Sequence, residues 1–246
     1  MTARTRNTFT LTSFNTRWGL TVNDEPFDLH AVLAGFDTDV ISLQEVWEPT
    51  NDAERIDTER IETVAADLGY QAIHVPLSPS RVDPRPEITA DPAEAAGTWG
   101  VALMSRLPIV STRVVDLGRM VERWDVADRY AILADLDLGP TVVTVTAVHL
   151  SFALPNALAQ LRRLGAYLPA HRPSVVAGDC NLWGPLATTV VGNHRRAVRG
   201  RTWPAARPHS QLDHILISPQ VAVVRSAVLG PAGSDHLPIE AELQIR

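Results

Sequence analysis

Apolar and polar positions alternate in short runs along much of this chain, a pattern typical of a sheet-rich fold. Residues 8–14 (TFTLTSF) alternate in a way that predicts a half-buried strand, and residues 39–43 (DVISL) form a short apolar run that predicts a buried one. The same criteria predict further strands at residues 70–75, 99–104, 110–117, 129–138, 141–149, 174–177, 211–217, 222–228 and 237–245.

Helical periodicity occurs in fewer places. A helix is expected near Pro26, which suits a first helical turn. Another is expected at residues 51–68, which begin with an Asn/Asp cap and end at Gly69. Residues 156–168 predict a third helix.

Residues 77–97 contain four prolines and little periodicity, so we expect a long mobile loop there. The strand pattern continues on both sides of this segment, which predicts one domain over residues 1–246. Many strands with few helices predict an α/β fold of the α+β kind, in which two sheets pack face to face with helices outside.

The composition is that of a folded globular protein, since 45% of the 246 residues are hydrophobic and 20% are charged. The net charge of -6 repels phosphate backbones at long range, so avid non-specific binding of nucleic acid is not expected. Every cation is an arginine, which excludes a Schiff-base lysine and a phosphate-loop lysine. Cys180 is the only cysteine, which excludes an intrachain disulfide.

The N-terminal residues lack an apolar run long enough for a signal peptide. No stretch of the chain reaches the length of a membrane span. We therefore expect a soluble, cytoplasmic protein, and nothing in the sequence implies an obligate protein partner.

Acids, amides and histidines gather next to the predicted strands, at the edge where the loops of a sheet converge. Asn15 comes directly after residues 8–14, and Glu45 follows residues 39–43. The other candidates, which lie at strand ends except for one within a strand, are His149, Asp179, Asn181, Asp213, Asp235 and His236. Their shared placement predicts a single polar pocket.

Hydrolysis of a phosphodiester is the chemistry that these side chains suit. The transition state gains negative charge, which a divalent cation neutralises. Mg²⁺ prefers oxygen ligands and keeps several waters, so one or two carboxylates and an amide are sufficient. Asn15, Glu45 and Asp235 are the candidate ligands, with Mn²⁺ as an alternative ion.

The remaining candidates suit the attack on phosphorus. Asp179 can act as the base for an attacking water, and Asn181, two residues further along an extended segment, would face the same side. His149 and His236 can donate to the phosphate or protonate a leaving oxygen near neutral pH. Asp213 can orient a histidine and raise its basicity, and His236 is the candidate.

Each candidate also has an ordinary structural interpretation. Asn15 could be a turn residue, His149 a core histidine bonded to a carbonyl group, and Asp235 a helix cap. Such interpretations would have to hold at every position at once, which is improbable. His214 is adjacent to Asp213 and points to the opposite face of a strand, so we expect it to be structural.

Zinc is the alternative metal, since His149, His236, Asp179 and Asp235 could ligate it. The sequence has no His-x-x-x-His motif and no cysteine pair, and its candidate amides suit magnesium better.

Six segments carry a resemblance to a known family. In chain order they are LTSFNTRWG, SLQEVW, VTAVHL, VVAGDCNLW, QLDHILIS and GSDHLPIEAEL, and they extend from Asn15 to Ile239. Together they resemble the ordered motifs of the endonuclease/exonuclease/phosphatase superfamily, which includes deoxyribonucleases, abasic-site endonucleases, inositol-polyphosphate 5-phosphatases and neutral sphingomyelinases. The resemblance implies a deoxyribonuclease-like four-layer sandwich with two mainly antiparallel central sheets, and metal-dependent hydrolysis of phosphoric esters.

The resemblance also implies the same roles for the candidates as the chemistry does, with Glu45 as the chief magnesium ligand and both histidines at the scissile phosphate. The family usually has a small or aromatic residue where Cys180 stands, and Thr, Ser or Asp is frequent at the position of Leu182. Neither departure removes a catalytic group.

Residues 192–210 (GNHRRAVRGRTWPAARPHS) hold five arginines and no acid, with Trp203 among them. Arginines and aromatic rings can grip phosphates and stack on bases, although a solvated loop explains the segment equally well. Its position between two of the motifs favours a role at the rim of the pocket. Trp203 is therefore a candidate substrate-binding residue, and Arg129, which opens a predicted strand, is a second.

Function hypotheses of different classes follow. The preferred one is a magnesium-dependent phosphodiesterase or endonuclease acting on a phosphoester substrate such as nucleic acid or nucleotides. The alternative is a phosphatase or sphingomyelinase-like phosphodiesterase acting on a small or lipid head-group phosphate. A non-catalytic phosphate-binding relative is disfavoured because every catalytic residue type is present.

Overall fold

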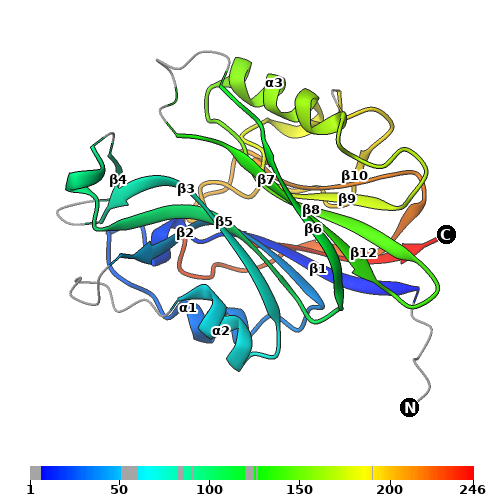
Figure 1. Ribbon diagram of the computed structural model, residues 1–246, viewed down its shortest axis with the longest axis horizontal. Coiled ribbons are helices and arrows are strands. Elements are labelled where there is room, and N and C mark those ends of the chain that lie inside the picture. The colour runs from blue at the N-terminus through cyan, green and yellow to red at the C-terminus, as the bar shows by residue number, and fades with distance from the viewer. Residues whose placement is uncertain are drawn as a thin grey trace.

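The computed structural model describes residues 7–50, 60–82, 86–89, 91–119, 125, 127–189 and 191–246. Two β-sheets pack face to face and helices cover their outer faces, as Figure 1 shows. This arrangement confirms the predicted four-layer α/β sandwich.

The first sheet has seven strands. They are β1 (Thr8–Asn15), β2 (Val40–Pro49), β3 (Gln71–Arg81), β4 (Glu87–Ile88), β5 (Gly97–Ser105), β12 (Val221–Val228) and β13 (Ile239–Ile245). In space they run in the order β12-β13-β1-β2-β5-β3-β4, so the N-terminal and C-terminal strands are neighbours.

The second sheet has six strands. They are β6 (Ile109–Asp116), β7 (Tyr130–Asp137), β8 (Val142–His149), β9 (Ser174–Asp179), β10 (Arg195–Arg196) and β11 (Asp213–Ile217). Their order is β10-β11-β9-β8-β7-β6. Every strand predicted from the sequence lies on one of these strands, with shifted ends.

Each sheet contains one parallel pair among the strands that the structure describes. β1 runs parallel to β2, and β8 runs parallel to β9, while the other paired strands are antiparallel. The carboxyl ends of a parallel pair lie at the same edge of the sheet. The fold therefore brings the ends of β1, β8 and β9 together beside the middle of β2, where the polar candidates lie.

Three α-helices pack on the outer faces of the described sandwich. They are α1 (Leu29–Ala34), α2 (Ile61–Asp67) and α3 (Leu154–Gly165), and the 3₁₀ turns are η1 (Arg17–Gly19), η2 (Pro92–Glu94) and η4 (Gly184–Thr188). The side chain of Asp28 caps α1 by accepting from the backbone N–H of Ala31. The helix predicted at residues 51–68 is observed only as α2, and residues 51–59 lie outside the described residues.

The hydrophobic core has three layers. Between the sheets, inward side chains such as Leu11, Val101 and Val145 are fully buried. Outside the six-stranded sheet, Leu161 of α3 packs with residues of β7, β8 and β9. Outside the seven-stranded sheet, helices α1 and α2 pack on residues such as Phe14. Apolar side chains on both faces of the central strands make this layering possible.

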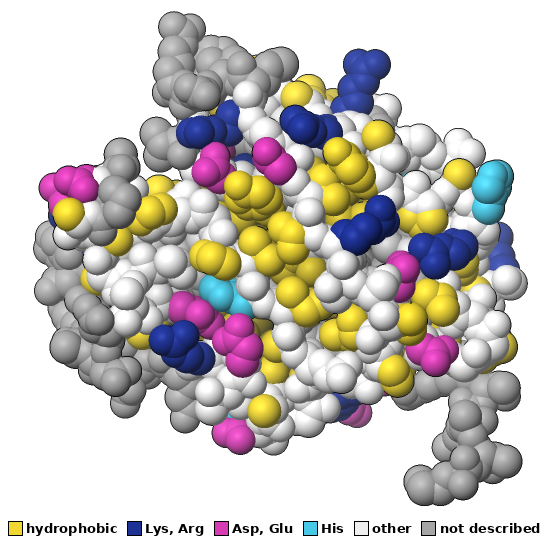
Figure 2. Space-filling view, viewed as in Figure 1, with side chains coloured by type: hydrophobic (Ala, Val, Ile, Leu, Met, Phe, Trp, Pro, Cys, Tyr) yellow, Lys and Arg dark blue, Asp and Glu magenta, His cyan; other side chains and the backbone are white. Residues whose placement is uncertain are grey.

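Figure 2 shows hydrophobic side chains gathered across the middle of one face, with charged groups scattered around them. Exposed apolar residues occur on β6, where Val110 and Val114 are 62% and 51% exposed. This strand is an edge of its sheet. Among the described residues, no helix has the length and apolar character needed to cross a membrane.

The prediction of a mobile loop at residues 77–97 is wrong for much of that segment. Strand β3 continues to Arg81, pairs with β4 at Ser80 and Arg81, and β5 already begins at Gly97. Pro76 and Pro79 are accommodated because β3 meets a strand on only one side up to Pro79, and its pairing with β5 shifts between Pro76 and Ser78. Prolines are tolerated at such edges and bulges, where no ladder N–H is needed.

Candidate active site

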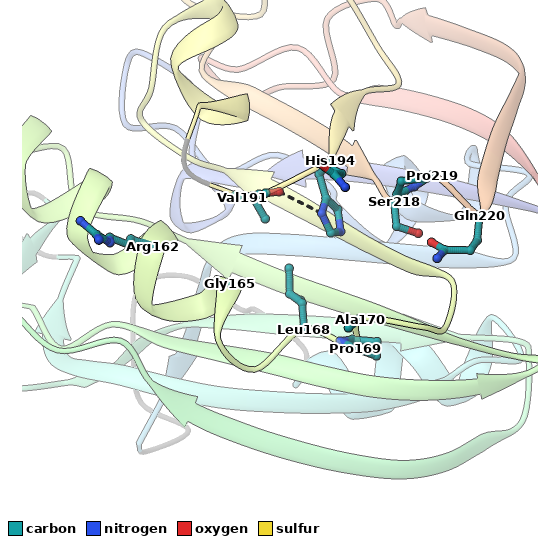
Figure 3. A pocket seen from close by; sticks show the side chains of 12 residues that line it. Arg162, Gly165, Leu168, Pro169, Ala170, Val191, His194, Ser218, Pro219 and Gln220 are labelled. Carbon is teal, nitrogen blue, oxygen red and sulfur yellow. Dashed lines mark hydrogen bonds between the residues drawn. The ribbon is translucent and has the colours of Figure 1, made fainter.

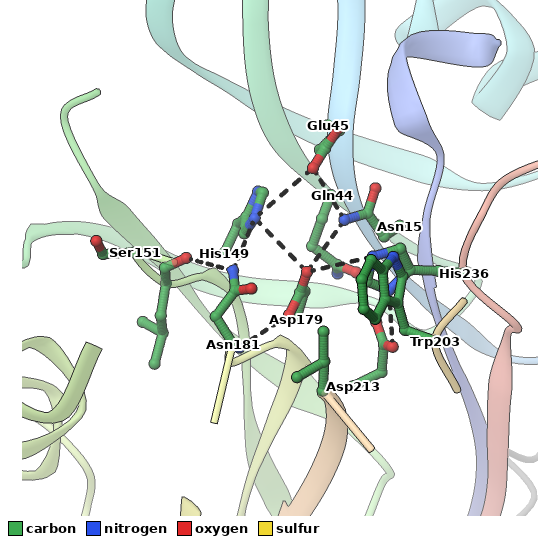
Figure 4. Close-up of polar contacts among 12 residues, drawn as sticks. Asn15, Gln44, Glu45, His149, Ser151, Asp179, Asn181, Trp203, Asp213 and His236 are labelled. Atoms are coloured by element: carbon green, nitrogen blue, oxygen red, sulfur yellow. Dashed lines mark hydrogen bonds and ion pairs between the residues drawn. The ribbon is translucent and has the colours of Figure 1, made fainter. Parts of the chain in front are cut away.

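The two parallel strand pairs place their paired C-terminal residues opposite one another across the sandwich. In the seven-stranded sheet, Asn15 ends β1 beside Gln44 of β2. In the six-stranded sheet, His149 ends β8 beside Asp179, which ends β9. Figure 4 shows these side chains converging with those of Glu45 and His236. The structure thus brings together most of the candidates that the sequence scattered along the chain.

Glu45 reaches the site because β2 bulges there. The sequence predicted that the strand ends at residue 43, but β2 continues to Pro49, and its register with β5 shifts between Gln44 and Val46. Glu45 adopts a φ of 55°, which is uncommon outside glycine, and its carbonyl oxygen accepts from the Thr16 hydroxyl at 2.9 Å. Such bulges re-aim a side chain next to an active site.

The carboxylate of Asp179 is at the centre of the cluster. Its Oδ2 accepts from Asn15 Nδ2 at 3.2 Å and lies 3.7 Å from His149 Nε2 and 3.8 Å from His236 Nε2. Its Oδ1 accepts from the backbone N–H of Asn181 at 2.8 Å. Burial raises the pKa of Asp179 to about 7, although the nearby His236 acts in the opposite direction.

Glu45 and Asn15 form the other half of the cluster. Asn15 Nδ2 donates to Glu45 Oε1 at 3.1 Å, so one amide group bridges Glu45 and Asp179. Asn15 Oδ1 accepts from the backbone N–H of Arg17 at 3.0 Å, which fixes the orientation of the amide. Burial raises the pKa of Glu45, because the charged carboxylate is poorly solvated there.

His236 is paired with Asp213, as the sequence analysis expected. Its Nδ1 lies 2.9 Å from Asp213 Oδ2, and both side chains are buried. Burial opposes the charged ring, but the adjacent Asp213 carboxylate outweighs it and raises the pKa of His236 to about 10. His236 is therefore an imidazolium at neutral pH, and its Nε2–H is directed towards Asp179.

His149 differs from His236 in its charge state. Burial lowers its pKa well below the usual range, and the charge of Arg129 adds to this effect. Its ring lies against Trp99 with centroids 4.9 Å apart, and its Nε2 lies 3.4 Å from Asn181 Nδ2. The two histidines of the site thus have different charges, which suits different tasks at one phosphate.

Asn181 faces the site for a different reason from the predicted one. The sequence analysis assumed an extended segment, but Asn181 has a φ of 51° and the chain turns there. Asp179 Oδ1 caps the turn, and Asn181 Nδ2 donates to the carbonyl oxygen of Leu150 at 2.9 Å. The amide therefore ties the loop after β9 to the loop after β8.

Asp235 is held at the side of the cluster. Its Oδ2 accepts from Trp203 Nε1 at 3.1 Å, and its Oδ1 lies 3.9 Å from Arg17 Nε. Among the described residues, the acids and histidine of the site whose ligand atoms lie within 4.8 Å of one another are Asp179, Asp213 and His236. Asp235 and Glu45, two of the predicted metal ligands, do not belong to that group.

Arg129 is buried in the wall of the site. It forms a double hydrogen bond with Asp125 at 3.1 and 2.9 Å, and its guanidinium lies 4.8 Å from the centroid of the Trp99 ring. Arg129 Nη1 also donates to the carbonyl oxygen of His149 at 3.5 Å. The sequence analysis missed Asp125 and Trp99, because a lone acid and a strand tryptophan carry no motif of their own.

A cavity of about 640 Å³ opens above these residues. The predicted substrate-binding residues Arg129 and Trp203 both line it, whereas the arginines of residues 192–210 are not among the described lining residues. Arg195 and Arg196 instead form β10, which pairs with Ile217 and Leu216 near the opposite end of β11 from Asp213. The expectation that this segment lies at the rim of the site therefore holds for Trp203 only.

A second cavity of about 400 Å³ lies between the C-terminal end of α3 and the turn at residues 218–220, as seen in Figure 3. His194 points into it, but its Nε2 contacts the Ser174 hydroxyl at 2.9 Å and its Nδ1 contacts the Val191 carbonyl oxygen at 3.1 Å. Both ring nitrogens are therefore engaged. His214 is also structural, as expected, because its Nε2 contacts the Leu182 carbonyl oxygen at 2.8 Å.

The donor set fits a divalent cation bound through oxygen. Glu45 and Asp179 are two desolvated carboxylates that share one amide donor, so negative charge is concentrated between them. A hard cation with carboxylate, amide and water ligands suits that environment. Glu45 could hold it through its carboxylate, whereas Asn15 could do so only with its amide turned over, because Nδ2 faces the carboxylates and Oδ1 accepts from the backbone N–H of Arg17.

Comparisons with known proteins agree with this picture. The structure is a two-sheet sandwich with a buried cluster of acids, amides and imidazoles at one end. Residues 12–236 match the model of the Endonuclease/Exonuclease/phosphatase family, so the chain belongs to that family. We accordingly assign it as a phosphoric ester hydrolase.

Solved structures with the same fold include an endonuclease/exonuclease/phosphatase from Beutenbergia cavernae, 24% identical, with a TM-score of 0.73 over 98% of this chain and 72% of that chain. A mannosyl-6-phosphatase of Bacteroides thetaiotaomicron is 17% identical, with a TM-score of 0.70 over 96% and 99% of the two chains. The catalytic domain of human Nocturnin is 20% identical, with a TM-score of 0.68 over 98% and 96%. No curated protein matches the sequence.

Proposed function

We propose that this protein is a magnesium-dependent phosphodiesterase that uses a water activated by Asp179 and two histidines at the phosphate. The observation that carries the proposal is the position of the Asp179 carboxylate, within 3.8 Å of Asn15, His149 and His236 side-chain nitrogens. A carboxylate whose pKa is raised by burial to about 7 is suited to accept a proton near neutral pH.

In the proposed reaction, a water oxygen attacks phosphorus while its proton passes to Asp179. The bond from phosphorus to the leaving oxygen breaks, and that oxygen takes a proton from the His236 imidazolium. Asn181 positions the water, and neutral His149 contacts a non-bridging oxygen. A divalent cation held by Glu45 and Asn15, with Asp235 nearby, would neutralise charge on the phosphate, and Mn²⁺ could replace Mg²⁺.

Nucleic acid or nucleotides are the proposed substrates, with Arg129 and Trp203 as residues of the substrate-binding wall. A phosphatase or lipid-type phosphodiesterase acting on a small or head-group phosphate is the second candidate. The likeness of this fold to a mannosyl-6-phosphatase favours keeping it. Both candidate functions use the same catalytic residues, so only the substrate that the protein hydrolyses distinguishes them.

The test compares wild type with Asp179→Asn, a variant of the same size that cannot take up the proton. With Mg²⁺, wild type should hydrolyse bis-p-nitrophenyl phosphate, and the variant should lose at least about 100-fold in kcat, the low end for a general base. Chelator should stop the wild-type reaction, and Mg²⁺ or Mn²⁺ should restore it.

Near-native activity of Asp179→Asn, or activity that resists chelator, would overturn the mechanism. A panel of plasmid DNA, RNA, an abasic-site duplex, sphingomyelin and inositol phosphates, assayed with Mg²⁺, then separates the substrate candidates. Cleavage of small phosphomonoesters alone would exclude the nuclease.

A further inference from the structure

The cavity above the site has two chemically different regions. Its floor is polar and contains Glu45, Asp179 and His236. Its walls are largely apolar and aromatic, and the residues that form them include Trp18, Ile88, Trp99, Phe152, Trp203 and Leu212. A phosphate alone uses only the floor, so the walls fit a further, apolar part of the ligand.

Phe152 is the wall residue that the proposed mechanism leaves unused. Its side chain is 68% exposed although it lines the cavity, and it stands three residues after His149. The backbone on either side is anchored: Ser151 N donates to Gln160 Oε1 at 2.9 Å, and Ala153 N donates to the Ser151 hydroxyl at 3.1 Å. Because ligand pockets are lined by aromatic side chains, an exposed ring on an anchored backbone that lines the cavity is placed to contact a ligand there.

The charges of the cavity limit what that ligand can be. Among its described lining residues, Arg129 is the arginine, and its guanidinium is already bonded to Asp125. Glu87 adds a carboxylate from β4, which is paired with Arg81 at 2.9 Å. Among the described lining residues, the positive side chains are Arg129 and His236, and both are paired with carboxylates, so one phosphate on the floor with an uncharged group on the wall fits these charges better than several phosphates.

We propose that Phe152 is a specificity-determining residue that stacks on a flat, uncharged ring next to the scissile phosphate, and that this ring is a nucleobase. The inference rests on the proposed function, since it places the phosphate on the floor beside Asp179. Bases stack on aromatic side chains irrespective of their identity, so one exposed phenyl ring suffices for a contact without sequence preference. The favoured substrate is thus a nucleoside phosphodiester with a single phosphate.

The experiment compares two substrates that differ only in the base: the methyl ester of thymidine 5′-phosphate and the methyl ester of 2-deoxyribose 5-phosphate. Alkyl esters are used because a nitrophenyl group could itself stack on Phe152. Phe152→Ala should lower kcat/KM for the thymidine ester roughly 10-fold, within the range of base stacking, and change kcat/KM for the abasic ester little. Phe152→Trp keeps an aromatic ring at this position, so it should retain the preference for the base that Phe152→Ala loses.

Trp183→Ala is the matched control, because Trp183 is also 68% exposed but is not among the described residues that line the cavity. It should leave the preference unchanged. Calorimetric binding of thymidine 5′-monophosphate and 2-deoxyribose 5-phosphate provides a second readout that needs no turnover. Wild type should bind the nucleotide more tightly, and Phe152→Ala should remove that difference.

Equal binding of the two phosphates by wild type, or an unchanged preference in Phe152→Ala, would overturn the inference. Failure of the proposed function gives a different result, namely no hydrolysis of bis-p-nitrophenyl phosphate by wild type. In that case the binding comparison still decides the role of Phe152.

Discussion

At the scale of single residues, Asp213 acts through His236. The two side chains are 2.9 Å apart and buried, and Asp213 is not among the described residues that line the cavity. Its contribution is to fix the tautomer and direction of the ring so that Nε2 faces Asp179. Asp213 is therefore a positioning residue.

Asp213→Asn should lower kcat about 10- to 100-fold, as loss of a carboxylate that orients a histidine typically does, while KM changes little. The reason is that the amide cannot support the imidazolium as the carboxylate does. Steady-state kinetics with the methyl ester of thymidine 5′-phosphate measures both constants. Asp39→Asn is the control, since Asp39 is a buried carboxylate at the start of β2 that accepts from Thr10. A drop of equal size in both variants would argue for a general effect on folding.

The residues of the cluster were predictable where each stands at the end of a strand. Asn15, His149 and Asp179 are the last residues of β1, β8 and β9. These residues meet because their strands end at the same place in the sandwich. The sequence pattern identified the end of each strand, and therefore these residues. Phe152 and Asp125 were not predictable, because nothing in a single sequence separates an exposed wall residue or a buried partner of Arg129 from any other phenylalanine or aspartate.

At the scale of the elements, the distance between β8 and β9 depends on Gly178. This residue has a φ of 153°, and a Cβ atom built on it would lie 1.9 Å from the carbonyl oxygen of Val148. It pairs with Val148 in β8 and with His214 in β11, and it directly precedes Asp179. The close approach that places His149 beside Asp179 thus requires the absence of a side chain.

Gly178→Ala should destabilise the protein by more than about 3 kcal/mol, because the backbone of a central strand pair would have to separate. Gly69→Ala provides the comparison. Gly69 also has a positive φ of 77°, but a Cβ there would meet nothing within 4 Å. Only the conformational cost of about 1–2 kcal/mol applies to it. Urea unfolding of both variants measures the difference, and equal destabilisation would contradict the packing argument.

Two elements show where the sequence pattern was insufficient. The prolines of residues 77–97 suggested a loop, but their cost depends on whether a neighbouring strand needs their N–H, and β3 has such a neighbour on one side only up to Pro79. Similarly, the bulge at Glu45 appears only in the pairing of β2 with β5. Both features are properties of strand pairs, which the pattern within one strand does not contain.

At the scale of the whole molecule, the site lies where the two sheets meet. Ser42 of β2 donates to the carbonyl oxygen of Ala177 in β9 at 3.0 Å, a polar link between the sheets beneath the cluster. The sequence predicted two sheets face to face because it contains many strands and few helices. It could not predict which strands oppose each other, because that depends on packing between residues far apart in the chain.

Concentrating carboxylates at this junction has a consequence for stability. Glu45 and Asp179 both have raised pKa values because burial disfavours their charged forms. Two such groups sharing the single Asn15 amide repel each other without a cation. Removing the charge of Glu45 should therefore stabilise the folded protein without metal, since active sites commonly trade stability for function.

Binding of a divalent cation to Glu45, next to Asp179, should raise the melting temperature, because the folded state alone assembles the site. A metal concentration of about 100 times Kd adds about 2.7 kcal/mol to the free energy of unfolding. For a chain of this size, each kcal/mol raises Tm by roughly 2–4 °C. Calorimetry with Mg²⁺, with Mn²⁺ and with chelator measures the shift without any substrate.

The variant Glu45→Gln tests whether this carboxylate holds the ion. It should have a higher Tm than wild type in chelator, and its Tm should rise much less than that of wild type when metal is added. Asp67→Asn, which changes an exposed carboxylate of α2 outside both groups of acids and histidine that could hold a metal, should follow wild type. A Tm of wild type that does not respond to either ion would mean that Glu45 does not hold a metal. A response that persists in Glu45→Gln would move the ion to one of the two other groups of acids and histidine among the described residues, Asp179 with Asp213 and His236, or Glu48 with Glu62 and His74.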